Sequence, residues 1–117
     1  MTARQKLIKK ADELWSQKIR SIGKCQRCGS VKYLQAAHIF SRKRQNLRWD
    51  LDNGLCLCRA CHLFWAHKEP IEFAHWVETV FANQYANVLE KKLTFDKIGE
   101  YNINKLDINA VITQLKG

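Results

Sequence analysis

The sequence lacks long hydrophobic stretches. No apolar run reaches 18 residues, so we expect no membrane-spanning helix. Residues 1–10 are polar and basic and do not contain the apolar core of a secretory leader. The sequence also has no internal repeat, low-complexity tract or interdomain linker, and its 117 residues predict a single domain over 1–117. These absences favour a reducing compartment, where cysteines are not used for disulfides.

Acidic residues are scarce in the first half of the chain. Residues 1–50 contain 3 Asp or Glu against 13 Lys or Arg, a net charge of +10. Residues 51–117 contain 8 against 7, a net charge of −1, which completes the total of +9. A charge distribution this uneven favours a surface that faces a polyanion over ordinary solvated charge. We therefore expect nucleic acid to be the partner.

The five cysteines include two Cys-x-x-Cys pairs. Cys25 and Cys28 form the first pair, Cys58 and Cys61 form the second, and 29 residues separate the two. This spacing predicts one four-thiolate zinc site, in which each pair forms a tight knuckle with Zn–S distances of about 2.3 Å. The fifth cysteine, Cys56, is too close to Cys58 for such a knuckle, and we expect it to be a buried thiol.

Hydrophobic periodicity predicts helices on both sides of this cysteine-rich segment. Residues 3–22 have apolar side chains at helical spacing, and Gly23 follows as a natural stop. Pro70 opens a second helix that Lys91 and Lys92 close, after which 94–105 is expected to be irregular. Asp107 is a plausible N-cap for a last helix. The second helix has an apolar stripe that we interpret as core: Phe73, Val77, Val80, Phe81, Tyr85, Val88 and Leu89.

The segment between the helices contains the residues with catalytic chemistry. Residues 31–40 are expected to form a strand ending near His38, 55–57 a second strand, and 60–68 a helix beginning near His62. Hydrolysis of a phosphodiester needs a general base for the water, a metal on the phosphate and groups that hold both in place. His38 and His62 are suitable residue types for this chemistry. Asn53, in the turn between them, can orient His38 or brace the loop.

These residues resemble the HNH nuclease family, also called ββα-metal or His-Me finger. The matching pattern consists of Cys25-x-x-Cys28, Ala37-His38-Ile39, Asp52-Asn53-Gly54 and Leu57-Cys58-x-x-Cys61-His62. Within the family, the chain looks most like phage recombination endonucleases of the NinG/Rap type. That finer resemblance rests on the upstream helix, the small residue before His38 and the run Trp49-Asp50-Leu51-Asp52-Asn53.

The resemblance implies a role for each matching residue. His38 would be the general base, Asn53 would fix the loop and His38, and His62 would bind a catalytic Mg²⁺ or Mn²⁺. The four paired cysteines would hold a separate, structural zinc. Many family members have Asp or His directly before the catalytic histidine as a second metal ligand, whereas this chain has Ala37. In order of preference, the replacement ligands we expect are His67, Asp50 and Asp52.

Each assignment has a simpler alternative. His38 would then be a core histidine, and His62 a residue that caps the second knuckle. His67 is expected to be a second metal ligand or a DNA contact, and the alternative is that it has no role at the site. The basic loop between the base and the turn could contact phosphates or be solvated surface. Its residues are Arg42, Lys43, Arg44 and Arg48.

The sequence thus predicts an α+β fold. A small zinc-bound ββα-metal (HNH) core over 24–68 is flanked by an N-terminal helix at 3–22 and C-terminal helices over 70–116. The predicted function is a metal-dependent DNA endonuclease, cytoplasmic in a bacterial or phage-infected cell and monomeric or homodimeric. The phage resemblance implies branched or recombination DNA as substrate. The alternatives are a non-catalytic zinc-knuckle DNA-binding module and a zinc-stapled protein-interaction module.

Overall fold

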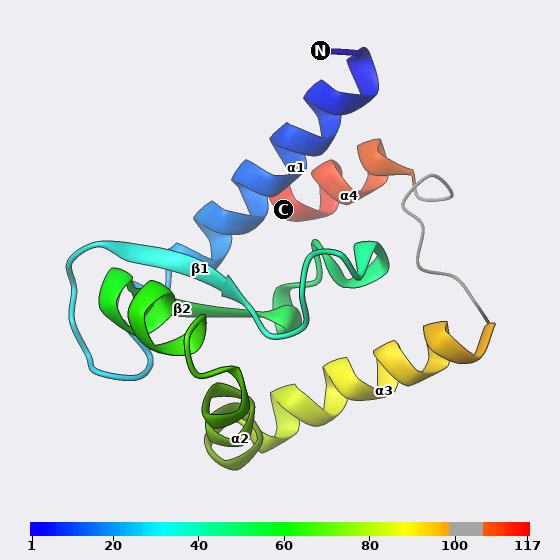
Figure 1. The fold of residues 1–117 in the computed structure, drawn as a ribbon. Helices are drawn as coiled ribbons and strands as arrows, with labels where there is room; N and C mark the ends of the chain where they lie inside the picture. The colour runs from blue at the N-terminus through cyan, green and yellow to red at the C-terminus, as the bar shows by residue number, and fades with distance from the viewer. Residues whose placement is uncertain (99–106) are drawn as a thin grey trace.

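The computed structural model describes residues 1–98 and 107–117, and it has the predicted α+β architecture (Figure 1). A two-stranded antiparallel hairpin lies in the middle of the molecule, with helices on both of its faces. No helix in the described residues is long and apolar enough to cross a membrane. The main elements are α1 (Ala3–Arg20), β1 (Leu34–His38), β2 (Gly54–Cys58), the π-helix η3 (Ala60–Ala66), α2 (Pro70–Val80), α3 (Ala82–Ile98) and α4 (Ile108–Lys116).

Helix α1 forms where the periodicity predicts it. Thr2 caps its N-terminus in a capping box, because its side chain accepts from the Gln5 N–H while the Gln5 side chain accepts from the Thr2 N–H. The helix buries Ala11, Trp15 and Ile19 and packs beside α4 (Figure 1). It also packs against the hairpin, so the N-terminal segment forms part of the wall around the centre of the molecule.

The pairing of the two strands fixes the position of His38, the last residue of β1. Leu34 pairs with Cys58, and His38 pairs with Gly54 at the far end of the ladder. A Cβ at Gly54 would lie 2.5 Å from Ile19 Cδ1 and 2.7 Å from a Trp15 ring carbon, so only glycine lets α1 approach this closely. The strand predicted over 31–40 is present but shorter, since the chain turns before Leu34.

The two faces of the hairpin face two separate cores. Ala36 and Cys56 pack against α1 and α4, whereas Ala37, Leu55 and Leu57 pack against η3 and α2. This division follows from the alternation of side chains along a strand. Cys56 is buried, as predicted for the spare thiol.

The long helix predicted after Pro70 is two helices. The chain leaves helical geometry at Phe81, whose φ and ψ are −117° and 48°, and α3 then starts at Ala82. The Phe81 ring lies edge to face with the Trp76 ring, with centroids 5.3 Å apart, a contact that the periodicity did not predict. Val80, predicted as core, is 56% exposed. Helix α3 runs on to Ile98, past the predicted end at Lys92, so residues 94–98 are helical. The rest of the segment predicted as irregular, 99–105, lies outside the described residues.

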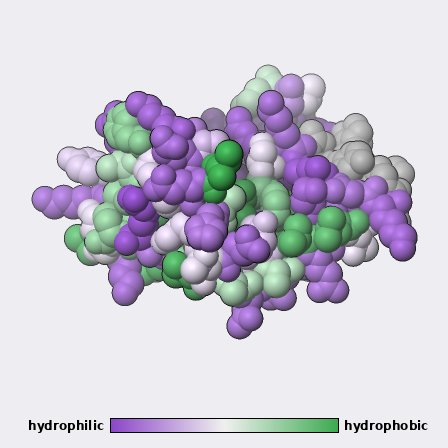
Figure 2. Space-filling model, turned by 60° about the horizontal axis from the view of Figure 1, so that its bottom comes forward, coloured by the Kyte–Doolittle hydropathy of each residue, from purple (hydrophilic) through white to green (hydrophobic). Residues whose placement is uncertain are grey.

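The last helix forms as predicted. The Asp107 side chain accepts a hydrogen bond from the Ala110 N–H at 3.3 Å and caps α4. Ile108, Ile112 and Leu115 are buried against α1. Figure 2 shows the side of the molecule that carries α2 and α3, where polar side chains separate the exposed hydrophobic residues into small patches.

Candidate active site

The four paired cysteines come together in space. Their sulfur atoms all lie within 4.8 Å of one another. Cys28 Sγ and Cys58 Sγ are 3.6 Å apart, close to the ~3.8 Å between two sulfurs of a tetrahedral zinc site. In each knuckle the backbone N–H of the second cysteine donates to the sulfur of the first, at 3.5 Å for Cys28 to Cys25 and for Cys61 to Cys58. This donor set fits a structural zinc ion.

The surroundings of the sulfurs also favour a cation. Burial raises the pKa of the Cys61 thiol to about 12, although Arg27 opposes this effect with Nη1 3.5 Å from the sulfur. At Cys25, burial also raises the pKa, but hydrogen bonds from nearby backbone N–H groups outweigh it and lower the pKa to about 6. Arg27 is itself held over the Trp65 ring, 3.6 Å from its centroid. Zinc would supply the remaining positive charge that a cluster of thiolates requires.

Three histidines line one cleft. The cleft has a volume of about 790 Å³ and lies between α1, the end of β1, η3 and the start of α2. His38 comes from β1, His62 from η3, and His67 directly follows η3. Asp12 of α1 and Arg42 of the loop after β1 also line it. The fold thus brings together imidazoles that lie up to 29 residues apart in the chain.

His38 is held on two sides. Its ring stacks on Trp15, with centroids 4.0 Å apart and planes 10° from parallel, and its Nε2 lies 3.0 Å from the carbonyl oxygen of Arg48. A carbonyl can only accept, so Nε2 carries the hydrogen and Nδ1 has the free lone pair. Burial lowers the pKa of His38 below 6.5, although the Arg48 carbonyl and Asp12 oppose this effect. His38 is therefore neutral near pH 7, with one nitrogen able to take a proton.

His62 is oriented in the same manner. Its Nδ1 lies 2.8 Å from the amide oxygen of Gln35, so Nδ1 donates and Nε2 retains the lone pair. Burial, with smaller contributions from the nearby His67 and His38, lowers the pKa of His62 to about 4. A neutral imidazole whose other nitrogen donates to an oxygen acceptor is the usual arrangement of a metal-binding histidine.

The π-helix brings His67 to His62. In an α-helix, residues five apart point about 140° away from each other. Here the His67 N–H donates to the His62 carbonyl at 3.1 Å, an i to i+5 bond, and the two rings meet edge to face with centroids 4.5 Å apart. The helix predicted over 60–68 is therefore present as a π-helix, Ala60–Ala66. Its geometry puts two imidazoles on the same wall of the cleft.

Asn53 braces the loop that follows β1. It is fully buried, its Oδ1 accepts from the Phe40 N–H at 2.8 Å, and its Nδ2 donates to the carbonyls of Phe40 and Leu47 at 3.0 and 3.1 Å. Its own carbonyl accepts from the Ile39 N–H at 3.0 Å. None of these bonds reaches the His38 ring. Of the two roles predicted for Asn53, the geometry therefore supports bracing of the loop.

Comparison with known families found one similarity, in the segment that contains the cysteines and the three histidines. The model of the family described as HNH endonuclease matches residues 25–69, from the first knuckle through His67. Residues 25–69 are thus similar to HNH endonucleases, and we call them the HNH segment for this similarity. No curated protein and no solved structure matches the chain. The three residues predicted to form the HNH pattern, His38, Asn53 and His62, all lie inside the segment, whereas helices α1, α2, α3 and α4 lie outside it.

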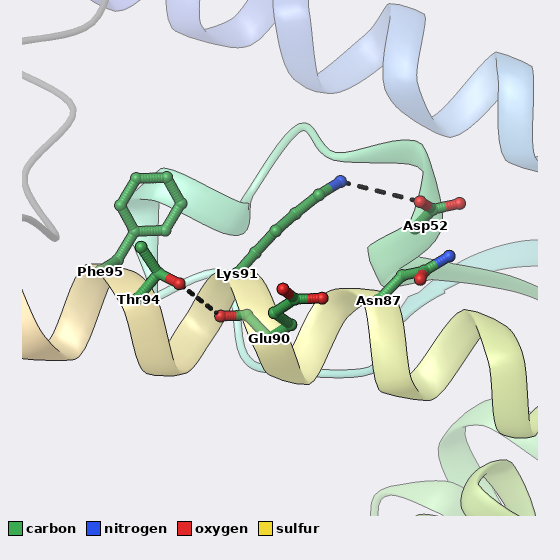
Figure 3. A pocket seen from close by; sticks show the side chains of 6 residues that line it. All are labelled: Asp52, Asn87, Glu90, Lys91, Thr94 and Phe95. Atoms are coloured by element: carbon green, nitrogen blue, oxygen red, sulfur yellow. Dashed lines mark hydrogen bonds and ion pairs between the residues drawn. The ribbon is translucent and has the colours of Figure 1, made fainter.

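The HNH segment has no carboxylate beside His38. Ala37 is 1% exposed and lines the cleft. Asp50 and Asp52, expected as alternative ligands after His67, both pair with Lys91 of α3, at 2.7 and 3.7 Å. Figure 3 shows Asp52 facing Lys91 in a separate cavity of about 470 Å³. Neither aspartate lines the cleft, so His67 is the one of the three expected ligands that does.

The basic loop of the HNH segment divides into two parts. Arg42 and Lys43 are exposed, and Arg42 lines the cleft. Arg44 forms an ion pair with Asp96 of α3. Arg48 is 16% exposed and forms a bidentate ion pair with Asp12, so its guanidinium is bound within the protein. Arg42 and Lys43 are thus the two of the four predicted phosphate contacts whose charge faces solvent.

Three residues that line the cleft or bind one of its histidines were not singled out from the sequence. Trp15 and Asp12 come from the helix before the HNH segment, and Gln35 comes from β1. Gln35 and Asp12 occur where polar residues are common, so nothing in the sequence marks them. Trp15 was interpreted only as one of the apolar residues that predict the first helix. The packing of α1 against the hairpin and the loop brings Asp12 to Arg48 and Trp15 to His38, and the position of η3 beside β1 brings His62 to Gln35.

Proposed function

We propose that this protein is a divalent-metal-dependent DNA endonuclease that hydrolyses phosphodiester bonds. The observation that carries the proposal is the convergence of His38, His62 and His67 on one cleft inside an HNH segment. Arg42 lines the cleft, and the next residue, Lys43, is exposed; both cations suit a phosphate backbone. The uneven charge of the chain, with +10 in residues 1–50, supports the same partner.

In this mechanism His38 is the general base. Its Nδ1 accepts a proton from the attacking water while the Nε2–H stays bonded to the Arg48 carbonyl. The Trp15 ring keeps the imidazole from rotating. As the oxygen of the water bonds to phosphorus, the bond from phosphorus to the leaving oxygen breaks. Asn53 keeps the loop that presents the Arg48 carbonyl in place through Leu47 and Phe40.

His62 and His67 are the residues that would hold the catalytic cation. Their imidazoles meet edge to face in the cleft, and Gln35 fixes the orientation of His62. A bound Mg²⁺ or Mn²⁺ would supply charge stabilisation at the scissile phosphate. In this proposal His67 replaces the ligand that Ala37 cannot provide, and water and phosphate oxygens complete the coordination, as is usual for magnesium.

The test is cleavage of supercoiled plasmid by the purified zinc-loaded protein, with Mg²⁺, with Mn²⁺ and with neither. His38→Ala should lower cleavage by on the order of 100-fold or more while DNA binding persists. His62→Ala and His67→Ala should lower cleavage, raise the metal concentration that half-maximal cleavage requires, and recover partly at high Mn²⁺. His75→Ala, on the exposed face of α2, is the matched histidine control and should cleave like the parent. Parent-level cleavage by His38→Ala would refute the mechanism.

The second candidate is a zinc-knuckle DNA-binding module without catalysis. Ala37 is the observation that favours it, since this position supplies no metal ligand. The two functions differ in one result: the binding module retains salt-dependent DNA affinity but leaves plasmid intact with either metal.

The preferred DNA structure is a further part of the proposal. We assign branched or recombination DNA on the resemblance of Trp49–Asn53 and the upstream helix to phage recombination endonucleases. Cleavage of a four-way junction should then exceed cleavage of a linear duplex of the same sequence at equal protein concentration. Equal rates on the two substrates would remove this assignment without affecting the endonuclease proposal.

A further inference from the structure

Helix α1, which lies outside the HNH segment, makes direct contacts with the surroundings of His38. Asp12 Oδ1 accepts from Arg48 Nε at 2.8 Å and from Trp49 Nε1 at 2.9 Å, and its Oδ2 accepts from Arg48 Nη2 at 2.7 Å. One carboxylate therefore binds two consecutive residues of the loop. The planar guanidinium suits this two-point contact, which fixes direction as well as distance.

Arg48 connects this carboxylate to the proposed base. Its side chain binds Asp12, and its carbonyl oxygen lies 3.0 Å from His38 Nε2. A shift of the Arg48 backbone would move the only carbonyl that selects the Nε2–H tautomer of His38 among the described residues. The ion pair is partly shielded, with the side chains of Arg48 and Asp12 16% and 34% exposed.

A second contact of α1 acts on the same ring. Trp15, one helical turn after Asp12, stacks on His38 at 4.0 Å, and its Nε1 donates to the Asp50 carbonyl at 2.9 Å. Asp12 and Trp15 thus bind the loop at Arg48, Trp49 and Asp50, while Trp15 covers one face of the imidazole. The helix and the loop form a single support for the base.

We propose that Asp12 is a positioning residue for the general base: through its ion pair with Arg48 it holds the carbonyl that keeps His38 in the Nε2–H tautomer with Nδ1 toward the water. This inference rests on the proposed function. It adds to it a residue that lies 13 positions before the first residue of the HNH segment. The catalytic unit therefore includes α1, and the HNH segment by itself lacks part of the support of its base.

The charges that face His38 agree with this role. Asp12 of α1 favours the protonated imidazole, whereas Arg42 and Arg48 of the loop oppose it, as does His62 of η3 when charged. Asp12 would therefore also stabilise the imidazolium that forms when His38 takes the proton of the water. Neutralising Asp12 should lower the pKa of His38 as well as loosen its support.

The experiment compares Asp12→Asn with Glu13→Gln in the zinc-loaded full chain. Glu13 is the neighbouring acid on the exposed face of α1 and serves as the matched control. Asp12→Asn should reduce kcat by about 10-fold or more with KM and DNA affinity unchanged, and should move the acidic limb of the pH–rate profile to lower pH. The nitrogen chemical shifts of the His38 side chain should indicate a single Nε2–H tautomer in the parent and a mixture of the two tautomers in Asp12→Asn. Glu13→Gln should match the parent in every measurement.

Arg48→Lys is the second variant, since it keeps the positive charge but loses the two-point contact with Asp12. It should reproduce the fall in kcat and the tautomer mixture, and it provides the deciding measurement if Asp12→Asn does not fold. Parent values of kcat and tautomer in whichever of the two variants folds would overturn the inference. If His38→Ala cleaves like the parent, the proposed function itself fails. If His38→Ala is inactive while both support variants behave like the parent, only the role of Asp12 is refuted.

Discussion

Substitution of Asn53 by alanine separates a structural role of this residue from a catalytic one. The side chain is fully buried and makes hydrogen bonds to the Phe40 N–H and to the carbonyls of Phe40 and Leu47. Removing it deletes these bonds and leaves one backbone donor and two carbonyls without their partner. At about 1 kcal/mol for each bond, the loss is about 3 kcal/mol, and more if water cannot reach the exposed groups.

A loss of this size is large for a small domain, whose total stability is typically about 5–15 kcal/mol. We therefore expect Asn53→Ala to lower the free energy of unfolding measured by urea denaturation at saturating zinc, and to lower cleavage along with it. Asn53→Asp should be destabilised as well, because it keeps the acceptor for Phe40 but loses both donors and buries a charge. Asn87→Ala, at an exposed position on α3, is the control and should change the stability little.

The result also decides between the two roles predicted for Asn53. If Asn53→Ala retains the stability of the parent to within ~0.5 kcal/mol but loses cleavage, the residue acts on His38 and the bracing argument is refuted. If stability and cleavage fall together, the residue acts through the loop that presents Arg48.

The remaining predictions concern the metal, the DNA, the base and the packing of the hairpin. Cys28→Ser should unfold or precipitate the protein, and the parent should contain about one zinc per chain by elemental analysis, because binding of structural zinc is coupled to folding. Replacing Arg42 and Lys43 together by alanine should lower the slope of log K against log salt by about 2 for duplex DNA. Cleavage should decrease on acidification only below pH 6.5, because burial lowers the pKa of His38 and the base acts in its deprotonated form. Gly54→Ala should destabilise the fold, because the added methyl group would lie 2.5 Å from Cδ1 of Ile19 in α1.

Each of these has an outcome that contradicts it. A zinc-free protein that stays folded would refute the structural role of the metal. An unchanged salt slope would move the DNA contact to another surface, such as the basic residues of α1. A cleavage rate that is halved well above pH 6.5 would mean that His38 is not the titrating base. Parent stability of the Gly54 variant would show that α1 can move away from the hairpin at no cost.

The cysteine spacing and the periodic segments were sufficient to predict much of the fold. Two Cys-x-x-Cys pairs require their four sulfurs to meet if they share an ion, and the structure places them within 4.8 Å. The helix over residues 3–22 and the helix capped by Asp107 follow from local signals: apolar spacing, a cap and a stop. Local signals of this kind act within a few residues, which is why they can be recognised in one sequence.

Contacts between distant segments decided the rest. The break at Phe81 has no glycine or proline to mark it, and the ring contact with Trp76 accompanies it. The two aspartates expected as ligands were drawn to Lys91, 39 or more residues away. Such pairings depend on how α3 lies against the loop, and no pattern in the sequence specifies that packing.

The sequence by itself determined the inventory of the site: two cysteine pairs suited to zinc, a His–Asn–His pattern and a basic first half. The tertiary structure decided which atoms are available for chemistry. A π-helical turn brings His67 to His62 although their spacing would separate them on an α-helix, and a carbonyl of Arg48 selects the tautomer of His38. Asp12 joins the same support from a helix outside the HNH segment. Residue type sets what a side chain can do, whereas the direction of its lone pairs is set by neighbours that only the folded chain supplies.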